Sequence, residues 1–583
     1  MNRKQRRAQE KMGGKQPAGG AAAQAQAPTP AAAAIPLTIP TPSLEVQREA
    51  NRFNDQALQA HGAGRSDEAL SLLRMAITLN PGQPLYHNNL GELLRLQGHT
   101  DLAMASLDEA IRLNPNYAEA RSNRGNLLRQ LGRGEEAITE YRAALKLKPD
   151  YADAMSNLGA VLIDRQDFAG AAEALKKAAR LNPDMGMIHR NLGLALTGLQ
   201  DMAGAETAYK ASLTAKYKPP GDAAEVCLLL GDIARLRNDL DTARQWYERG
   251  WNERPGYGEA HNRYAVSLMV DGRYREAWPH FEARWSLADT DVDKRPFTQP
   301  FWKGEALAPG QNLLLFTEQG VGESLVLWSL LPELLARGIT PIVECDPRMI
   351  PILERSFPGI EAYGRANPPH PRFSAPDLAM QATLFDLARV FRQSPADCTG
   401  ALPIRADIAR TAALRKQYLA GNDTPLIGIA WHSASPKLGA PKSALLTDLA
   451  PFLSLPGLRF VDLQYGDRAD DRATLKQAHN VDVIADPAID QMKDLDAFAA
   501  QVAAMDMVVS TSNTTAHMAA ALGKPTLVLL HHGISPHWYW TRNGDTTPWY
   551  PTTRLLRQPA AGNWHSLAET VATELKLRFP SAK

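Results

Sequence analysis

The chain has 583 residues, of which 44% are hydrophobic; this length suits roughly three or four domains, and this composition excludes disorder throughout. Its 64 Lys and Arg residues nearly balance its 63 Asp and Glu residues, which excludes the strongly basic field of a dedicated nucleic-acid-binding protein. Three widely spaced cysteines support neither a disulfide framework nor a zinc site, and no run of about 18 apolar residues predicts a membrane span.

Residues 1–43 are predicted to form a disordered arm. The first 15 residues carry six basic side chains and one acidic one, and residues 16–42 are mostly Ala, Pro, Gln and Gly. Such a segment buries too little apolar surface to offset the entropy of ordering it. A solvated tail is favoured over contact of the basic start with acidic lipid or RNA. Since no apolar core of a signal peptide is present, the sequence favours a cytoplasmic protein.

A 34-residue period follows the arm. Proline and glycine recur in one register, at Pro81, Pro115, Pro149 and Pro183 and at Gly91, Gly125, Gly159 and Gly193. Glycine suits the point where two antiparallel helices cross closely, and proline ends one helix pair before the next begins. The pattern resembles tetratricopeptide repeats and resumes after an insertion at residues 217–223. We therefore expect an α-solenoid of about seven helix pairs over residues 44–286.

An asparagine recurs just before the repeated glycine, at Asn89, Asn123, Asn157 and Asn191. Asparagine is a poor residue inside helices, so its recurrence needs a reason. In tetratricopeptide repeats such a row resembles a ladder that holds an extended peptide, which implies that an acceptor protein or peptide binds through the repeats. The alternative is hydrogen bonding between neighbouring repeats. A solenoid by itself indicates no chemistry.

Strand and helix patterns alternate from residue 312 onward. Short apolar runs predict strands at 312–316 and 341–345, and then at 426–431, 458–463, 481–484, 507–510 and 526–530. This alternation predicts parallel sheets covered by helices. We expect a linker at 287–311 and two Rossmann-like α/β domains at 312–415 and 424–578. Ligands of such folds bind beyond the carboxyl ends of the strands, which selects the loops to inspect.

The loop after the strand at 507–510 is rich in hydrogen-bond donors. Ser512, Asn513, Thr514 and Thr515 lie at the start of the next expected helix, where free backbone N–H groups attract anions such as a diphosphate. His517 falls in the first turn, where we expect it to face the anion. The alternative is ordinary helix capping beside a hydrogen-bonded histidine.

Residues 507–530 resemble the nucleotide-sugar loop of heptosyltransferase-like glycosyltransferases of the GT-B fold. Trp538, Arg542 and the segment 549–559 resemble the end of the same family. Ser512 stands where that family usually has an aspartate, which points to a different sugar nucleotide or to lost activity. Repeats joined to such a domain resemble bacterial repeat-containing glycosyltransferases, including those that modify flagellin; the resemblance covers residues 44–578.

Two further loops supply candidates in the light of this resemblance. Gly320 and Gly322 follow the strand at 312–316 and permit close approach of the acceptor. Glu323 stands where the family has an aspartate that acts as general base; the alternative is a carboxylate favoured by a helix start. Lys442 precedes a serine, as a basic residue does in the family, and can neutralise a diphosphate leaving group; the alternative is a solvated lysine. Gln464 is a weaker candidate for donor contact.

These expectations describe a metal-independent glycosyltransferase. It would transfer a sugar from a nucleotide-sugar donor, its co-substrate, to a hydroxyl of a protein such as flagellin, with no cofactor, no metal and no nucleic-acid partner. One alternative is a repeat scaffold with an inactive transferase domain, as Ser512 suggests. A dinucleotide enzyme is a weaker alternative: Gly320 and Gly322 precede Glu344, but Leu325 occupies the third glycine position. The sequence specifies neither the sugar nor the oligomeric state.

Overall fold

The computed structural model describes residues 42–287, 295–398, 400, 404–433, 439–532 and 537–580. The expected disordered arm therefore lies almost wholly outside the described residues, as does part of the expected linker. The chain divides into two compact units, residues 1–149 and 150–583, which are described in turn. Within the described ranges no helix is long and apolar enough to cross a membrane.

The described part of the first unit, from residue 42 onward, contains three helix pairs. The second and third pairs cross at a glycine: Gly91 faces Leu107 and Gly125 faces Tyr141, with no room for a side chain. The turn within each pair holds a glycine with positive φ, such as Gly98 and Gly132. The helices are α2 (Leu44–Gly62), α3 (Ser66–Leu79), α4 (Pro84–Leu96), α5 (Thr100–Leu113), α6 (Ala118–Gln130) and α7 (Gly134–Leu147).

The second unit begins with four more helix pairs, so the fourteen helices α2–α15 confirm the predicted solenoid. The insertion lies between α11 and α12, that is, between the second and third of these four pairs. There the backbone N–H of Tyr217 donates to the carbonyl of Asp184, and its carbonyl accepts the N–H of Gly186. The helices are α8 (Ala152–Asp164), α9 (Phe168–Leu181), α10 (Gly186–Gly198), α11 (Met202–Thr214), α12 (Asp222–Leu236), α13 (Leu240–Glu253), α14 (Gly258–Val270) and α15 (Tyr274–Phe281).

A four-stranded parallel sheet follows, in the order β3-β2-β1-β4. The sequence predicted two of its strands with the same bounds. The other two have no continuous apolar run: β3 has only four residues and starts with a glutamate, and Gln381 interrupts β4. The strands are β1 (Asn312–Phe316), β2 (Pro341–Cys345), β3 (Glu361–Gly364) and β4 (Leu378–Thr383), and the helices are α16 (Val321–Leu327), α17 (Leu331–Ala336), α18 (Ile350–Ser356), α19 (Leu384–Phe391) and α20 (Ile408–Leu419).

The last module has a seven-stranded sheet in the order β10-β11-β9-β8-β5-β6-β7, parallel except for the β10–β11 pair. Two sheets of this kind confirm the expected α/β class. The strands are β5 (Leu426–Ala430), β6 (Arg459–Asp462), β7 (Val483–Ile484), β8 (Met507–Thr511), β9 (Thr526–Leu530), β10 (Thr546–Thr547) and β11 (Tyr550–Arg557), and the helices are α21 (Gly439–Lys442), α22 (Ala450–Leu453), α23 (Ala469–His479), α24 (Leu495–Ala503), α25 (Thr514–Ala521) and α26 (Trp564–Arg578).

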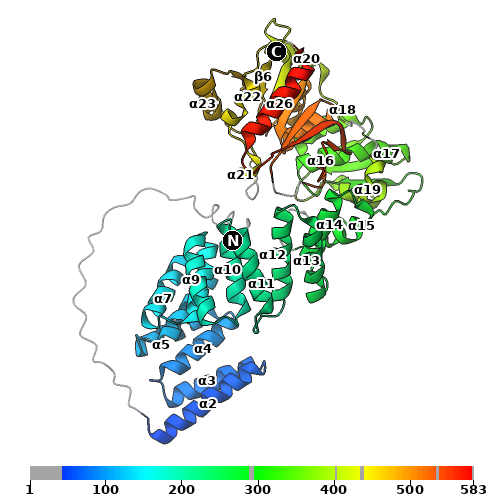
Figure 1. The fold of residues 1–583 in the computed structure, drawn as a ribbon. Coiled ribbons are helices and arrows are strands. Elements are labelled where there is room, and N and C mark those ends of the chain that lie inside the picture. Colours follow the sequence, from blue (N-terminus) through cyan, green and yellow to red (C-terminus); the bar gives the residue numbers. More distant parts are fainter. Residues whose placement is uncertain are drawn as a thin grey trace, which may run out of the picture. The chain divides into compact units, whose positions relative to one another are not determined.

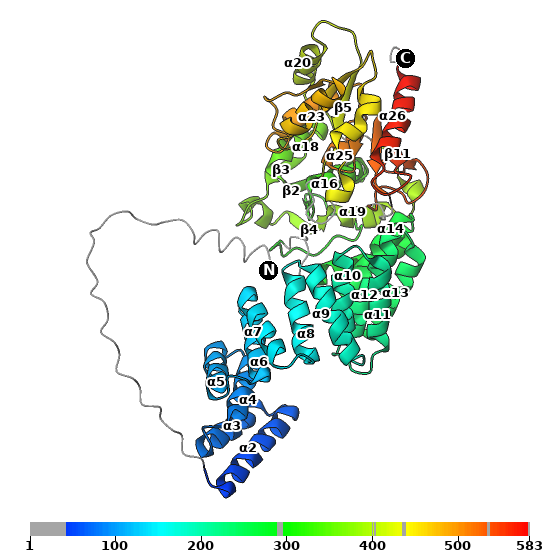
Figure 2. The ribbon, with the colours of Figure 1, turned by 60° about the vertical axis from the view of Figure 1, so that its left-hand side comes forward.

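One buried apolar cluster joins the end of the solenoid to both sheets. Trp278 from α15 packs within this cluster, and its indole N–H donates to the backbone oxygen of Arg392 at 2.7 Å. The indole N–H of Trp549 donates to the hydroxyl of Tyr274 at 3.0 Å. Figure 1 and Figure 2 both draw α14 close to α19. Helices α13–α15 are therefore part of the core of the α/β modules as well as the end of the solenoid.

The Gly125→Ala substitution tests the close crossing of α6 and α7. Its Cβ would lie 2.7 Å from Cε1 of Tyr141, whose ring is fully buried. We expect the free energy of local opening of α6 and α7 to fall by about 1–3 kcal/mol, measured by hydrogen exchange. Gly62→Ala in α2 is the control, because its Cβ meets nothing within 4 Å. Equal protection in both variants would contradict the crossing.

Candidate functional site

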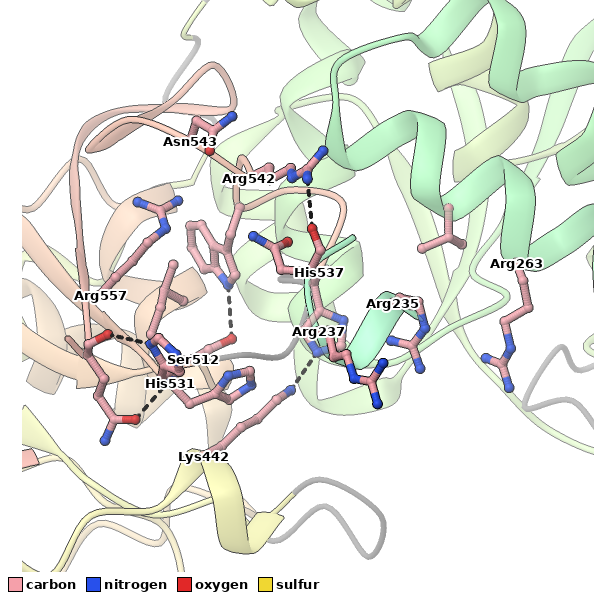
Figure 3. A pocket seen from close by; sticks show the side chains of 16 residues that line it. Arg235, Arg237, Arg263, Lys442, Ser512, His531, His537, Arg542, Asn543 and Arg557 are labelled. Carbon is pink, nitrogen blue, oxygen red and sulfur yellow. Dashed lines mark hydrogen bonds between the residues drawn. The ribbon is translucent and has the colours of Figure 1, made fainter. Parts of the chain in front are cut away.

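A cavity of about 570 Å³ lies within the second unit, between helices α12–α14 and the last α/β module (Figure 3). This volume falls in the usual range for small-molecule sites. Ser512, His531 and Gln558 line it, and each directly follows a neighbouring strand: β8, β9 or β11. The cavity therefore lies at the carboxyl ends of the strands, where α/β folds bind their ligands.

Cationic side chains dominate the cavity, since five arginines and one lysine line it and no described lining residue is a carboxylate. Arg542 joins its two walls by donating from Nη2 to the backbone oxygen of Asn238 at 2.7 Å. Arg557 donates to the backbone oxygens of Gly544 and Thr541, and burial lowers its pKa. Such a lining favours an anionic ligand. The cationic residues are Arg235, Arg237, Arg263, Lys442, Arg542 and Arg557.

Lys442 lines the cavity and is only 7% exposed, so it is not the solvated loop lysine of the alternative interpretation. Its Nζ lies 2.5 Å from Nε2 of His537. Burial lowers the pKa of Lys442 to about 8, while the nearby Glu323 carboxylate acts in the opposite direction. Burial also lowers the pKa of His537 to about 3, so this imidazole is neutral and accepts the hydrogen bond from the ammonium group.

Ser512 is the residue of the predicted diphosphate loop that lines the cavity. Its Oγ accepts a hydrogen bond from the indole N–H of Trp540 at 2.9 Å. Asn513 instead caps α25, because its Oδ1 accepts the backbone N–H of Thr515 at 3.0 Å. Thr515 is buried, and its hydroxyl donates to the backbone oxygen of Leu463. Thr514 is half-buried at the first position of α25. The observed hydrogen bonds therefore agree with the capping alternative, in which Asn513 caps the helix and the N–H of Thr515 is one of the capped groups.

His517 does not line the cavity, contrary to the prediction that it faces a bound anion. It is 3% exposed, stacks on Trp540 with ring centroids 5.0 Å apart, and places Nδ1 3.1 Å from the hydroxyl of Tyr550. Burial lowers its pKa to about 3, so it carries no charge for an anion at neutral pH. The imidazole of His517 is instead enclosed by the aromatic side chains of Trp540 and Tyr550.

Gly320 and Gly322 belong to the α/β module with the four-stranded sheet, called the first module below, and both make contacts within the folded chain. A Cβ on Gly322 would lie 3.0 Å from Cδ2 of His517, so the missing side chain lets α16 approach α25. The carbonyl of Gly320 accepts the backbone N–H and the hydroxyl of Ser324. Neither glycine lines the cavity. These contacts within the chain explain both glycines without the predicted contact with an acceptor.

Glu323 reaches the same region from the first module, at the start of α16. Burial raises the pKa of its carboxyl group, while Lys442 acts in the opposite direction. Tyr539 interacts with Glu323, and burial raises the pKa of this tyrosine well above its usual range, so its hydroxyl stays protonated. The folded chain thus brings together Glu323 and Lys442, a carboxylate and an ammonium group from two different modules.

Gln464 has a structural role. Its Oε1 accepts the backbone N–H groups of Trp431 and His432 at 2.9 and 2.8 Å, and its Nε2 donates to the backbone oxygen of Tyr465. These hydrogen bonds join the end of β5 to the end of β6. Both the oxygen and the nitrogen of the amide already form hydrogen bonds, which leaves little capacity for the predicted contact with a nucleotide-sugar donor.

The asparagines of the first unit hydrogen-bond between repeats, as the alternative interpretation supposed. Nδ2 of Asn89 donates to Oδ1 of Asn54 at 2.8 Å, and Nδ2 of Asn123 donates to Oδ1 of Asn88 at 2.9 Å. In the second unit, Asn157 is half-buried and Asn191 is buried. The amides of Asn89 and Asn123 are thus used within the solenoid rather than held ready for a peptide.

The dinucleotide alternative conflicts with the position of Glu344. This residue is 1% exposed, and its Oε1 accepts a hydrogen bond from Nη2 of Arg295 at 2.5 Å. A carboxylate paired in this way is not available to the hydroxyls of a ribose. Leu325 is fully buried where the fingerprint requires a small residue. No group of three or more potential metal ligands gathers anywhere in the described residues.

Sequence reasoning missed the solenoid wall of the cavity. Arg235, Arg237 and Arg263 lie on the repeat helices or just after them, where basic residues usually form a solvated face. Arg542 and Arg557 belong to the segments that resemble the glycosyltransferase family, but the sequence predicted no function for either side chain. Only the folded chain shows that these five arginines surround one cavity.

Comparisons with known proteins identify the repeats. A family model described as TPR repeat matches residues 91–132 and 125–164, and two models described as tetratricopeptide repeat match residues 156–219 and 224–249. The repeats are therefore tetratricopeptide repeats, a fold used for contacts between proteins. Protein FlbA of Caulobacter vibrioides is 31% identical over 329 residues, which cover 54% of each chain. The chain thus spans about half the length of this curated relative.

Solved structures with similar folds include repeat proteins. PilF of Pseudomonas aeruginosa is 22% identical, with a TM-score of 0.34, over 37% of this chain and 97% of that chain. PilW, described as a type IV pilus biogenesis factor, is 20% identical, with a TM-score of 0.34, over 36% and 97%. YrrB, described as a TPR protein with an unusual peptide-binding site, is 21% identical, with a TM-score of 0.28, over 32% and 95%.

The Lys442→Met substitution tests the burial of the cavity lysine. Because the pKa of Lys442 is lowered to about 8 from 10.5, the unfolded chain binds more protons between these pH values, and the lysine's contribution to stability rises with pH there. At pH 7 we expect the variant to be more stable than the wild type by about 1–3 kcal/mol in urea denaturation. This gain should shrink towards pH 10.5. A variant that is less stable at pH 7 would contradict the burial of a charged lysine.

Proposed function

We propose that the protein is a glycosyltransferase that transfers a sugar from a nucleotide-sugar donor to a hydroxyl group of a protein acceptor. The observation that carries the proposal is the cationic cavity at the carboxyl ends of β8, β9 and β11, with Glu323 of the facing module close enough to Lys442 for their charges to interact. A nucleotide sugar has the matching chemistry, because it carries phosphates beside neutral groups that form hydrogen bonds. Two α/β modules with the donor site on the second are the GT-B arrangement that the sequence resembles.

The cationic side chains would bind the phosphates of the donor. When the bond between the anomeric carbon and the phosphate oxygen breaks, negative charge grows on the leaving nucleotide. Lys442 is buried and Arg557 is half-buried in the cavity wall, so water screens their charges less there than at an open surface. The ammonium group of Lys442 is held by a neutral imidazole and therefore keeps its charge available for the leaving phosphate.

Glu323 would be the general base. The acceptor hydroxyl oxygen attacks the anomeric carbon, and its proton passes to the Glu323 carboxylate as the bond to the phosphate breaks. Burial raises the pKa of Glu323, which makes the carboxylate a stronger base than a solvated glutamate. The protonated hydroxyl of Tyr539, which interacts with this carboxylate, would orient it. These two effects support base catalysis over a purely capping role for Glu323.

The tetratricopeptide repeats would supply the acceptor site. Solenoids of this type present an extended surface to partner proteins, and the resemblance to repeat-containing glycosyltransferases implies flagellin as the acceptor. Since Asn89 and Asn123 donate to other asparagines, other side chains of the repeats would hold the acceptor peptide. The absence of a spanning helix in the described ranges is compatible with the proposed cytoplasmic location.

A thermal-shift screen of the purified full chain against UDP-, GDP-, ADP- and CMP-sugars tests the donor site. Stabilisation by one nucleotide class, lost in Lys442→Gln, is the expected result. No response to any of the four classes would favour the inactive scaffold over the transferase.

The Glu323→Gln substitution separates catalysis from donor binding. With the stabilising nucleotide sugar and the acceptor protein, we expect the transfer rate to fall by about 100-fold or more, since a positioned base contributes on the order of 10²–10⁴. The thermal shift by the donor should remain, because Glu323 does not line the cavity. Glu354→Gln is the control: this glutamate is exposed on α18, and its change should leave transfer intact. Full activity of Glu323→Gln would exclude it as the base.

A further inference from the structure

The repeat solenoid contributes three of the six cationic side chains that line the cavity (Figure 3). Arg235 belongs to α12, Arg237 follows this helix, and Arg263 belongs to α14. Figure 3 shows Arg235 and Arg237 on the side of the cavity near Lys442 and His537, with Arg263 farther along the same wall. A solenoid that only captured an acceptor protein would not need arginines at this position.

Two of these arginines are held in place by one carboxylate. Oδ1 of Asp232 lies 3.3 Å from Nε of Arg235 and 3.3 Å from Nε of Arg263. The same oxygen accepts a hydrogen bond from the hydroxyl of the fully buried Tyr247 at 3.0 Å. Asp232 is thus fixed by Tyr247 and orients both guanidinium groups through their Nε atoms. One negative charge is shared by two positive charges, so this wall keeps a net positive charge.

The opposite wall offers neutral hydrogen-bonding groups. Gln558 is 4% exposed, and its Oε1 accepts the backbone N–H of His532 at 3.0 Å, which fixes the side-chain amide. Its Nε2 has no partner in the described structure, and the same holds for Nδ1 of His531. Buried polar groups without partners are rare in folded proteins, so these two atoms indicate a ligand that forms hydrogen bonds. Cations on both walls, together with these unpaired polar groups, match a phosphate ester of a polar organic group.

We propose that Arg235 and Arg263 of the repeat solenoid bind the phosphates of the nucleotide sugar, so that the solenoid forms one wall of the donor site. This inference rests on the proposed transferase function. Arginine is suited to the task because its planar guanidinium group donates two parallel hydrogen bonds to a phosphate. Among the described residues, the contact of each arginine with Asp232 runs through Nε, so its Nη groups can donate to a ligand. The donor site then exists only when the solenoid is joined to the α/β modules.

Calorimetric titration of the full chain with UDP, GDP, ADP and CMP tests the proposal. For the nucleotide that binds the wild type, the double variant Arg235→Gln/Arg263→Gln should raise Kd by about 10- to 100-fold, because it removes charge-assisted hydrogen bonds. Its binding should also depend less on salt concentration. The control is Arg249→Gln on α13, whose arginine pairs with Glu253 and does not line the cavity; its Kd should stay within about twofold.

A second variant guards against misfolding. Arg235→Lys/Arg263→Lys keeps both charges but loses the planar guanidinium groups, and its affinity should lie between those of the wild type and the glutamine variant. Wild-type affinity in the glutamine variant, together with lost binding in Lys442→Gln, would overturn the role of the solenoid and leave the proposed transferase intact. Failure of the wild type to bind any of the four nucleotides would overturn the donor site itself.

Discussion

The shared hydrophobic core between the end of the solenoid and the two α/β modules determines the rest of the structure. Trp278, Phe281 and Met269 from the repeats are buried in the same cluster as Trp328 and Trp549 of the α/β modules. Burial of large apolar and aromatic side chains makes the largest favourable contribution to such an interface. Because of this core, α12–α14 are held at a fixed position relative to β8, β9 and β11, and a cavity can be lined from both sides.

A buried ion pair strengthens the same junction. Arg284 follows the last solenoid helix, and its guanidinium group donates to both carboxylate oxygens of Glu318 at 3.1 and 3.2 Å. Glu318 lies in the loop between β1 and α16, two residues before Gly320. Breaking one partner of such a pair leaves an uncompensated buried charge, so the pair specifies one arrangement. The loop that presents Glu323 is therefore anchored to the solenoid as well as to its own sheet.

The electrostatics of the cavity follow from burial. Lys442 has a lowered pKa and Glu323 a raised pKa, while His517 and His537 are neutral. Buried charged groups of this kind are costly to stability, and their clustering at a cavity is typical of functional sites. The neutral His537 places a hydrogen-bonding group beside Lys442 without adding like charge.

Much of the fold could be predicted from sequence, because each predicted element depends on local pattern. The 34-residue period located the helix pairs, and buried apolar runs located strands such as Asn312–Phe316 and Thr526–Leu530. The strand Glu361–Gly364 was not predicted, because it is only four residues long, lacks an apolar run and has no fully buried residue.

The site was harder to predict, because its chemistry depends on contacts between distant residues. Lys442, Ser512 and Glu323 were found from loop position and family resemblance, and the first two line the cavity. The capping hydrogen bonds of Asn513 and the backbone contacts of Gln464 cannot be distinguished from ligand-binding roles in a sequence. The arginines of the solenoid wall line the cavity only because α12–α14 pack against the last module, which no local sequence pattern predicts.

Hydrogen exchange of the full chain, with and without the nucleotide sugar that stabilises it most, tests the central claim most directly. The account predicts that the donor protects two separate regions: the end of α12 with α14, and the segments that follow β8, β9 and β11. Protection confined to the loop between β1 and α16 and to the end of β2 would contradict the account, because the ligand would then occupy the first module instead of the shared cavity.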